Sequence, residues 1–323
     1  MRPLKFHPIL KQTLWGGERI IPYKELASGL SRVGESWELS GMPGSESVVA
    51  EGPWAGSTLP ELIGHFGAEL LGKANYARFG QEFPLLVKFI DAREDLSIQV
   101  HPDDELARKR HGKSGKCEMW YVLEAEPGAS LLTGFSRPIA PAEYERRVAD
   151  NTLTDVLNRQ AIASGDVFYL PAGRVHSIGK GSFIVEIQQS SDITYRIYDF
   201  DRRDAAGNSR ELHTELAREA IDFESSENSR ITYAPENNQE VRLVTTPYFT
   251  TSLYTLTART RCDWSATDSF VAIVLLQGSG SLTDNEGNRI DVRQGETWLL
   301  PASTQWTEIT PHTAPLRLLT SRI

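Results

Sequence analysis

The feature that most constrains the fold is a gapless repeat, twelve residues long, in the middle and near the end of the chain. Residues 165–176 read Gly-Asp-Val-Phe-Tyr-Leu-Pro-Ala-Gly-Arg-Val-His, and residues 295–306 read Gly-Glu-Thr-Trp-Leu-Leu-Pro-Ala-Ser-Thr-Gln-Trp. In each copy a glycine and an acid form a turn, a short strand follows, and Pro-Ala turns the chain again. The apolar segments 120–123 and 272–275 correspond in the same way upstream. The repeat predicts two copies of one small antiparallel β-barrel.

The two copies differ at their last position, where His176 in the first copy corresponds to Trp306 in the second. A purely structural histidine would serve equally well in either copy. The difference therefore indicates that the first copy carries a function that the second has lost.

An alternating segment upstream of the first copy supports this interpretation. Leu96, Ile98 and Val100 alternate with three polar residues, Ser97, Gln99 and His101. Residues two apart share one face of a strand, so one face is apolar and the other is polar. Polar side chains on the inner face of a barrel are unfavourable unless something uses them. A metal ion could bind two of them; the alternative is an edge strand whose polar face meets water.

Four polar residues on three predicted strands form a candidate metal site: Gln99, His101, Glu118 and His176. Two imidazoles, a carboxylate and an amide oxygen suit Zn²⁺ or a similar divalent ion. Fe²⁺, held by two histidines and a carboxylate, is the rival assignment.

Three further residues leave two interpretations open. Lys88 lies within the apolar strand 84–90, so it either reaches to the surface or binds an anionic ligand. Trp15 and Trp37 either stack on a sugar face or pack in the core or at its rim.

The chain length, 323 residues, allows two domains. Apolar residues recur at helical spacing in two segments, near 58–80 and 141–160. A polar, turn-rich segment at 224–240 separates them from an all-β remainder. We therefore expect an N-terminal domain over residues 1–235, with helical segments, and a C-terminal β-domain over residues 236–323 without metal ligands.

Composition limits the partners. The net charge of −9 argues against nucleic acid or an anionic membrane surface, so an anionic ligand requires a local basic cluster. No apolar run is long enough to span a bilayer, and no signal peptide is evident. Cys117 and Cys262 are the only cysteines and belong to no paired motif, which favours a reducing cytoplasm.

The sequence also resembles a known family. Residues 165–176 look like the second motif of cupin barrels. The following segments resemble signatures of the type I mannose-6-phosphate isomerases, in their short bacterial form: 96–103, 116–121, 191–199, 15–17 and 34–37. The resemblance runs across nearly the whole chain. It implies a mainly β fold of two cupin-like antiparallel barrels, or jelly rolls, with helical segments inserted in the N-terminal, catalytic half.

The same resemblance implies an activity and roles for individual residues. It implies one zinc ion per chain on Gln99, His101, Glu118 and His176, and interconversion of mannose 6-phosphate and fructose 6-phosphate. By the same match, Arg196 is an active-site arginine, Ser97 and Lys116 lie beside the substrate, and Glu186 falls near the acid/base glutamate proposed for the family.

From these residues we expect an isomerisation through a cis-enediol. Glu186 is the candidate proton carrier, and Arg196 and Lys116 would stabilise negative charge. The basic cluster for an anion would contain Lys88, Ser97, Lys116 and Arg196, with Trp15 and Trp37 near the sugar.

Two other functions remain open: a cupin that binds or senses a sugar phosphate without turnover, and an iron-dependent dioxygenase. The second barrel is most simply structural, and the chain is expected to act as a monomer or homodimer.

Overall fold

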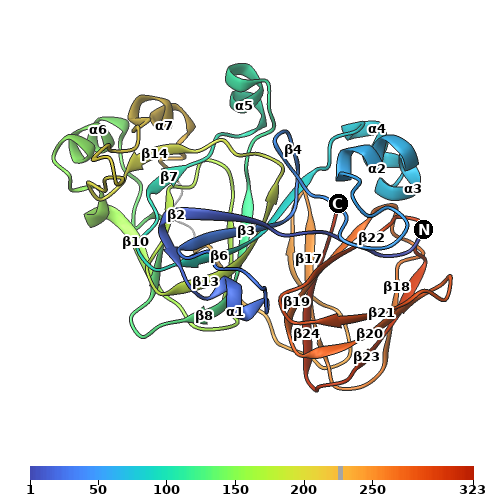
Figure 1. Ribbon diagram of the computed structural model, residues 1–323. Helices are drawn as coiled ribbons and strands as arrows, with labels where there is room; N and C mark the ends of the chain where they lie inside the picture. Colours follow the sequence, from blue (N-terminus) through green and yellow to red (C-terminus); the bar gives the residue numbers. More distant parts are fainter. Residues whose placement is uncertain (225–227) are drawn as a thin grey trace.

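The computed structural model describes residues 1–224 and 228–323. The fold is mainly β, as expected, and consists of four antiparallel sheets and one small hairpin, β4 (Gly41–Met42) with β5 (Ser45–Glu46). Figure 1 shows two halves side by side: one is formed by most of the N-terminal part of the chain, and the other by the C-terminal part together with the N-terminus and the helices of residues 59–79. The predicted boundary segment 224–240 includes residues 225–227, which lie outside the described residues.

The N-terminal half contains a seven-stranded and a five-stranded sheet that face each other. The first runs β15 (Arg230–Ile231), β11 (Val167–Leu170), β8 (Glu118–Ala125), β13 (Ser182–Gln189), β6 (Leu85–Ala92), β2 (Ile9–Gly17) and β3 (Val33–Leu39). The second runs β10 (Leu157–Ala161), β9 (Ser130–Phe135), β12 (His176–Ile178), β7 (Ile98–Val100) and β14 (Tyr195–Tyr198). One buried cluster joins Trp120 and Ile184 of the first sheet to Leu131 and Ile178 of the second, so the apolar core lies between them.

The C-terminal half is built in the same way from a six-stranded and a four-stranded sheet. The first runs β1 (Leu4–Lys5), β22 (Thr297–Leu300), β19 (Val271–Gln277), β24 (Leu316–Arg322), β17 (Thr250–Leu256) and β16 (Val241–Thr245). The second runs β18 (Thr260–Asp263), β23 (Trp306–Pro311), β20 (Ser279–Asp284) and β21 (Arg289–Arg293). Ile273 and Trp298 of the larger sheet pack with Leu282 and Ile309 of the smaller one.

Strand order shows that the two halves repeat one topology. β8 lies between β11 and β13, and β19 lies between β22 and β24. The two copies of the sequence repeat occupy equivalent places, because residues 165–176 contain β11 and residues 295–306 contain β22. His176 and Trp306 each begin the strand that follows, β12 and β23.

A third apolar core joins the halves. Phe89 and Phe183 of the seven-stranded sheet belong to the same buried cluster as Val274 and Leu276 of the six-stranded sheet. The start of the chain also crosses over, because β1 pairs with β22. Gly72 approaches the other half so closely that a Cβ there would lie 2.2 Å from the Asp268 carbonyl oxygen, and its φ of +95° also favours glycine. These contacts join the two halves through a shared core.

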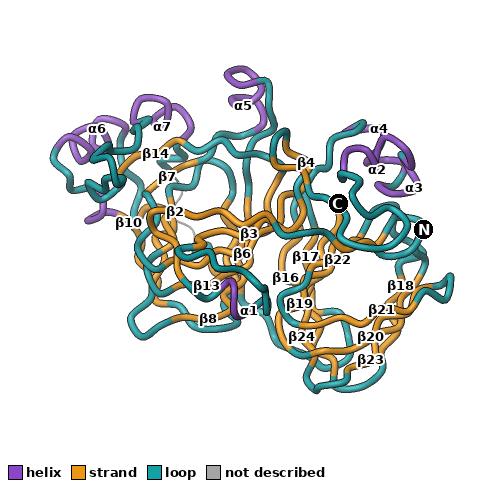
Figure 2. The backbone as a smooth tube through the Cα atoms, viewed as in Figure 1, coloured by secondary structure: helices purple, strands orange, loops and turns teal. Residues whose placement is uncertain are grey.

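The helices lie mostly along one edge of the molecule (Figure 2). They are α1 (Ile20–Tyr23), α2 (Leu59–Phe66), α3 (Ala68–Leu71), α4 (Lys73–Phe79), α5 (Asp104–His111), α6 (Pro141–Ala149), the 3₁₀ turn η1 (Leu153–Val156) and α7 (Thr214–Ala220). Thr58 caps α2 in a reciprocal capping box with Glu61. Among the described residues, no helix is both long and apolar enough to cross a membrane.

One part of the helix prediction was wrong. The segment 141–160 is helical in α6 and η1, but its last residues form β10, which pairs with β9. Leu153, Val156 and Leu157 are all buried and fit a helical spacing, yet only Leu157 of these lies on the strand. Pairing with the edge of a sheet outweighed local helical periodicity here.

Candidate metal centre and active site

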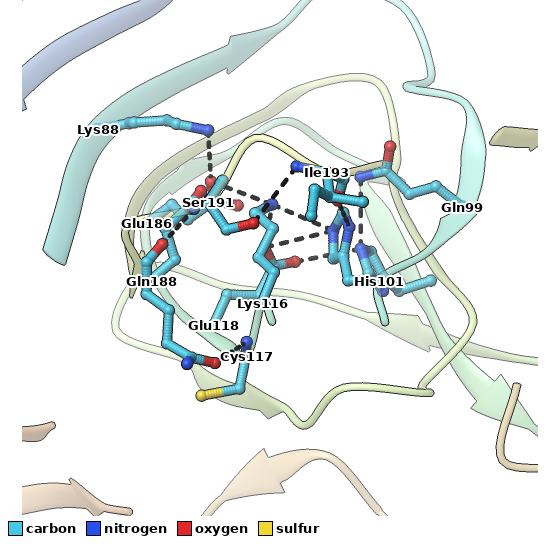
Figure 3. Close-up of polar contacts among 12 residues, drawn as sticks. Lys88, Gln99, His101, Lys116, Cys117, Glu118, Glu186, Gln188, Ser191 and Ile193 are labelled. Carbon is cyan, nitrogen blue, oxygen red and sulfur yellow. Dashed lines mark hydrogen bonds and ion pairs between the residues drawn. The ribbon is translucent and has the colours of Figure 1, made fainter. Parts of the chain in front are cut away.

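Three buried side chains from different strands converge at one end of the N-terminal half. His101 directly follows β7, Glu118 begins β8, and His176 begins β12. The alternation at 96–101 explains part of this, because Ile98 and Val100 are fully buried in the core and His101 lies on the other face. One ligand atom from each of His101, Glu118 and His176 can be chosen so that all lie within 4.8 Å of one another. Figure 3 shows His101 and Glu118 with their polar neighbours.

Each histidine is oriented by a backbone carbonyl. His101 Nδ1 lies 2.7 Å from the Ile193 carbonyl oxygen, and His176 Nδ1 lies 2.7 Å from the Arg174 carbonyl oxygen. These contacts assign the proton of each ring to Nδ1, so that each Nε2 presents a lone pair. Histidine ligands of metals are commonly held in this way by the group behind the ring.

The same assignment shows that the group suits a cation. Glu118 Oε1 and His176 Nε2 face each other at 3.1 Å, both as acceptors, and Glu118 Oε2 lies 3.6 Å from His101 Nε2. Two lone pairs at that distance repel unless a proton or a metal ion lies between them. Distances of this size match the edges of a tetrahedron around Zn²⁺ with ligands about 2.0–2.2 Å away. The donor set therefore fits a divalent metal.

Gln99 and Lys116 complete the surroundings of this group. The Gln99 side-chain amide approaches His176 Nε2 to 3.3 Å through the atom assigned as nitrogen, and exchanging amide N and O would turn the oxygen toward the centre. Lys116 Nζ donates to Glu118 Oε2 at 2.6 Å and lies 3.1 Å from His101 Nε2. Lys116 is 5% exposed, so this ion pair is shielded from water.

Burial and neighbouring charges set the protonation of these groups. Burial, followed by the positive charge of Lys116, holds the pKa of His101 well below its usual value, so its imidazole is neutral. Burial opposes ionisation of Glu118, but the positive charge of Lys116 outweighs it and holds the pKa of Glu118 well below its usual value. A neutral imidazole and an ionised carboxylate are the forms that bind metals.

A second buried carboxylate, Glu186 on β13, lies in the same region. Lys88 Nζ donates to Glu186 Oε1 at 3.0 Å, and Trp120 Nε1 donates to Glu186 Oε2 at 2.9 Å. Lys116 Nζ is 4.0 Å from Glu186 Oε1, so Lys116 lies between the two carboxylates. Burial would lower the pKa of Lys88, but the negative charges of Glu186 and Glu35 outweigh it and raise that pKa. Lys88 therefore does not reach to the surface but is a buried, charged partner of Glu186.

Of these side chains, Lys88, Gln99, Lys116 and Glu186 line one cavity of about 140 Å³. Its walls are formed by Trp15, Glu35, Lys88, Ile90, Leu96, Ser97, Gln99, Lys116, Ile178, Glu186, Thr194, Arg196 and Arg210. Arg196 stands on β14, which pairs with β7, so it lies on the same sheet as Gln99. The structure therefore brings Ser97, Gln99, Lys116, Glu186 and Arg196 to one space.

The two tryptophans behave differently. Trp15 is 4% exposed and lines the cavity, while most of it packs in the core between the sheets. Trp37 is not among the residues that line the cavity. Its Nε1 donates to Glu35, and its ring contacts the ammonium groups of Lys88, 5.2 Å from the ring centre, and Lys11, at 4.8 Å. Trp37 therefore supports the cavity wall from behind.

Sequence reasoning assigned no role to Glu35, Trp120 or Arg210. Trp120 shares a strand face with Glu118, so the alternation of β8 could have revealed it. Glu35 likewise shares a strand face with Trp37 on β3. Arg210 lies between β14 and α7 in a segment without periodicity, so no sequence signal places it at the cavity.

The chain is similar to known proteins along most of its length. The model of the phosphomannose isomerase type I catalytic domain matches residues 4–132. Two proteins of Bacillus subtilis, the mannose-6-phosphate isomerase ManA and the probable mannose-6-phosphate isomerase GmuF, are each 34% identical over 303 residues, covering 93% of this chain and 93% of the relative. The chain belongs to the type I phosphomannose isomerase family.

Solved structures agree with this family. The crystal structure of the Bacillus subtilis mannose 6-phosphate isomerase matches with a TM-score of 0.90 at 30% identity, and the match covers 100% of both chains. A putative mannosephosphate isomerase from Archaeoglobus fulgidus has a TM-score of 0.79 at 22% identity, over 99% of this chain and 98% of the other, which supports the fold alone. The residues of the centre thus lie in a phosphomannose isomerase fold that spans the whole chain.

Proposed function

We propose that this protein interconverts mannose 6-phosphate and fructose 6-phosphate. The relatives that support this are named for mannose 6-phosphate isomerisation. The observation that carries the proposal is the buried group of His101, Glu118 and His176, which adjoins a cavity containing a second, hydrogen-bonded carboxylate, Glu186. A site that only binds a sugar does not require that carboxylate, whereas transfer of a proton between carbons does.

One zinc ion per chain would be held by Gln99, His101, Glu118 and His176. The facing lone pairs of Glu118 and His176 favour a cation there, and the carbonyl contacts of both imidazoles free their Nε2 atoms. Bound there, zinc would supply a Lewis acid for the sugar oxygens. Lys116, beside Glu118, would keep part of that carboxylate's charge neutralised.

The residues of this chain would then divide the proton transfer. Glu186 would take a proton from one of the two sugar carbons and return it to the other. Lys88 and Trp120 each donate to one of its oxygens, which fixes the orientation of the carboxylate. Arg196 and Lys116 would stabilise negative charge on the enediol or on the phosphate in a buried cavity, where charges interact strongly. Ser97, Lys88 and Trp15 would contact the sugar, and Trp37 would support them.

We further propose that each pair of facing sheets forms a cupin-like barrel, with a catalytic domain over residues 1–235 and a second domain over residues 236–323 without metal ligands. The equivalent strand orders of the two halves support this division. The protein would act as a monomer or homodimer on a free hexose 6-phosphate.

Proton NMR in D₂O tests the proposal. Purified protein is incubated with mannose 6-phosphate, and both the formation of fructose 6-phosphate and the entry of deuterium at C2 are followed. We expect both, their loss after complete removal of metal with a chelator, and their recovery with Zn²⁺. Full activity after metal removal would refute the metal's role. Binding of the sugar phosphate with neither product nor exchange would identify a sensor instead.

A further inference from the structure

A cluster of arginines lies at the mouth of the active-site cavity, around one buried carboxylate. Arg210 donates to Asp199 through two nitrogens, Nε to Oδ2 at 2.8 Å and Nη2 to Oδ1 at 2.5 Å. Arg202 Nη2 lies 3.4 Å from Asp199 Oδ1. Arg196 is close enough that the charges of Arg210 and Arg202, after burial, lower its pKa.

The balance of charge differs between this cluster and the lysines. Lys116 is paired with Glu118 at 2.6 Å, and Lys88 is paired with Glu186 at 3.0 Å. Each lysine thus has its own buried carboxylate. In the arginine cluster, Asp199 is the one carboxylate among the described residues that forms an ion pair with Arg202 or Arg210, and Arg196 Nη1 donates instead to the Glu211 carbonyl. The carboxylates of Glu211, Glu94 and Asp95 act on Arg196 and Arg202 from farther away. Within ion-pair distance the arginines thus outnumber the carboxylates, which favours binding of an anion.

Hydrogen bonding in the cluster is also incomplete. Among the described residues, no acceptor reaches Arg196 Nε or Arg202 Nη1, and both nitrogens are buried. Buried N–H groups without an acceptor are unfavourable and are uncommon in native proteins. An oxyanion with several acceptor atoms would satisfy groups of this kind.

Position connects the cluster with the substrate. Arg196 and Arg210 line the cavity that also contains Gln99, Lys116 and Glu186. Arg210 lines a second, wider cavity as well, of about 550 Å³, which shares Trp15 and Glu35 with the first. Arg210 therefore stands where the buried site opens outward, so a charged end of a substrate can meet it while the other end reaches the metal centre.

We propose that Arg210, together with Arg196, binds the phosphate of the sugar phosphate, and that Asp199 positions Arg210 and Arg202 for this. The choice of a sugar phosphate rests on the proposed function. The expected anion site shifts from the lysines toward the arginines, because Lys88 and Lys116 each have a buried carboxylate of their own, whereas Arg202 and Arg210 share one, Asp199. Arg210 thereby becomes the residue that separates phosphorylated from unphosphorylated hexoses.

Calorimetry on the metal-loaded full chain tests this with three probes: mannose 6-phosphate, inorganic phosphate and mannose. Arg210→Met removes the guanidinium but keeps an extended side chain. We expect it to weaken binding of both phosphates about 10–100-fold, the range for hydrogen bonds to charged groups, and to leave mannose binding within about twofold. Arg203→Ala is the matched control, because Arg203 is exposed in the same loop and its side chain donates, among the described residues, to the Gly207 carbonyl alone. It should bind all three probes like the parent.

Arg210→Lys is a second variant that tests the inference even if Arg210→Met does not fold. It keeps the charge but lacks the fork, so we expect an intermediate loss for both phosphates. Unchanged phosphate binding in either variant, or an equal loss for mannose and mannose 6-phosphate, would overturn the inference. If the parent binds mannose 6-phosphate through Arg210 but does not isomerise it, the proposed function fails and this inference stands. If it isomerises and Arg210 proves irrelevant, only the inference fails.

Discussion

The two halves of the molecule share a strand order but differ in chemistry at corresponding positions. Register gives the correspondence: Leu170 pairs with Glu118, and Leu300, its counterpart in the sequence repeat, pairs with Val271. Where the first half has a buried carboxylate at the start of β8, the second has a buried valine at the start of β19.

The other site residues follow the same rule. Glu186 and Lys88 pair with each other on β13 and β6, and Thr320 and Ser252 take their places on β24 and β17. The position of His176 is filled by Trp306, whose ring lies 4.1 Å from the Arg261 guanidinium. Buried charges are expensive unless they are paired or bound to a metal. At these corresponding positions they are present in the half that lines a cavity with Gln99 and Arg196 and not in the other, so they mark the half in which we propose the active site.

The largest effect is expected when His176 is replaced and compared with replacement of its counterpart, Trp306. His176→Ala removes one of three converging ligands, and we expect metal affinity to fall by more than about 100-fold, since even partners behind the ligands contribute 10–100-fold. Activity should fall to background. Metal content by mass spectrometry after dialysis, together with the NMR assay, measures both.

Trp306→Ala is the matched control in the second half. It should keep full metal content and activity, because no ligand stands there. A metal-free Trp306→Ala protein would mean that the second half shapes the centre directly, and the division between working and supporting halves would be wrong.

The next test concerns proton transfer. Glu186→Gln keeps the size of the side chain but removes its basicity, so we expect kcat to fall about 10²–10⁴-fold with metal content unchanged. Thr320→Val changes the equivalent position and removes a buried hydroxyl that has no partner among the described residues. It should leave kcat unaltered. A Glu186→Gln enzyme with normal turnover would remove Glu186 from the mechanism.

Patterns in the sequence were sufficient to bring together His101, Glu118 and His176 and insufficient to reveal the arginine cluster around Asp199. Alternation at 96–101 and on β8 predicts which strand face carries His101 and Glu118, because strand periodicity is a local property of the sequence. The sequence repeat predicts that His176 begins the strand after the Pro-Ala-Gly turn. The pairing of Lys88 with Glu186 depends on the register between β6 and β13, which are 98 residues apart in sequence at that contact. Arg210 and Asp199 meet through an irregular loop. Contacts of this kind follow from tertiary packing and have no periodic signal.

A smaller effect is expected on stability, where the halves should behave alike. Phe270 is fully buried beside Phe83, with ring centres 4.8 Å apart, in the core that joins the halves. Phe270→Ala should lower the free energy of unfolding by about 3–5 kcal/mol. Urea denaturation followed by tryptophan fluorescence and by residual activity should show one shared transition. Leu212→Ala, at a residue 47% exposed, should stay within about 0.5 kcal/mol of the parent. Separate transitions would show that the shared core does not couple the halves.

The last prediction is that the cysteines of both halves do not react in the folded protein. Each half has one buried cysteine, and burial raises the pKa of both Cys117 and Cys262 to about 12. The reactive thiolate is then only about one part in 10⁴ at pH 8, and its fraction rises as the pH approaches that value. A disulfide reagent at pH 8 should therefore label neither cysteine in the folded protein and both in urea. Labelling of Cys262 alone would mean that the second half opens while the first stays closed, because exposure by local unfolding precedes reaction. That result would identify the C-terminal half as the less stable one, whereas the shared core predicts that both halves open together.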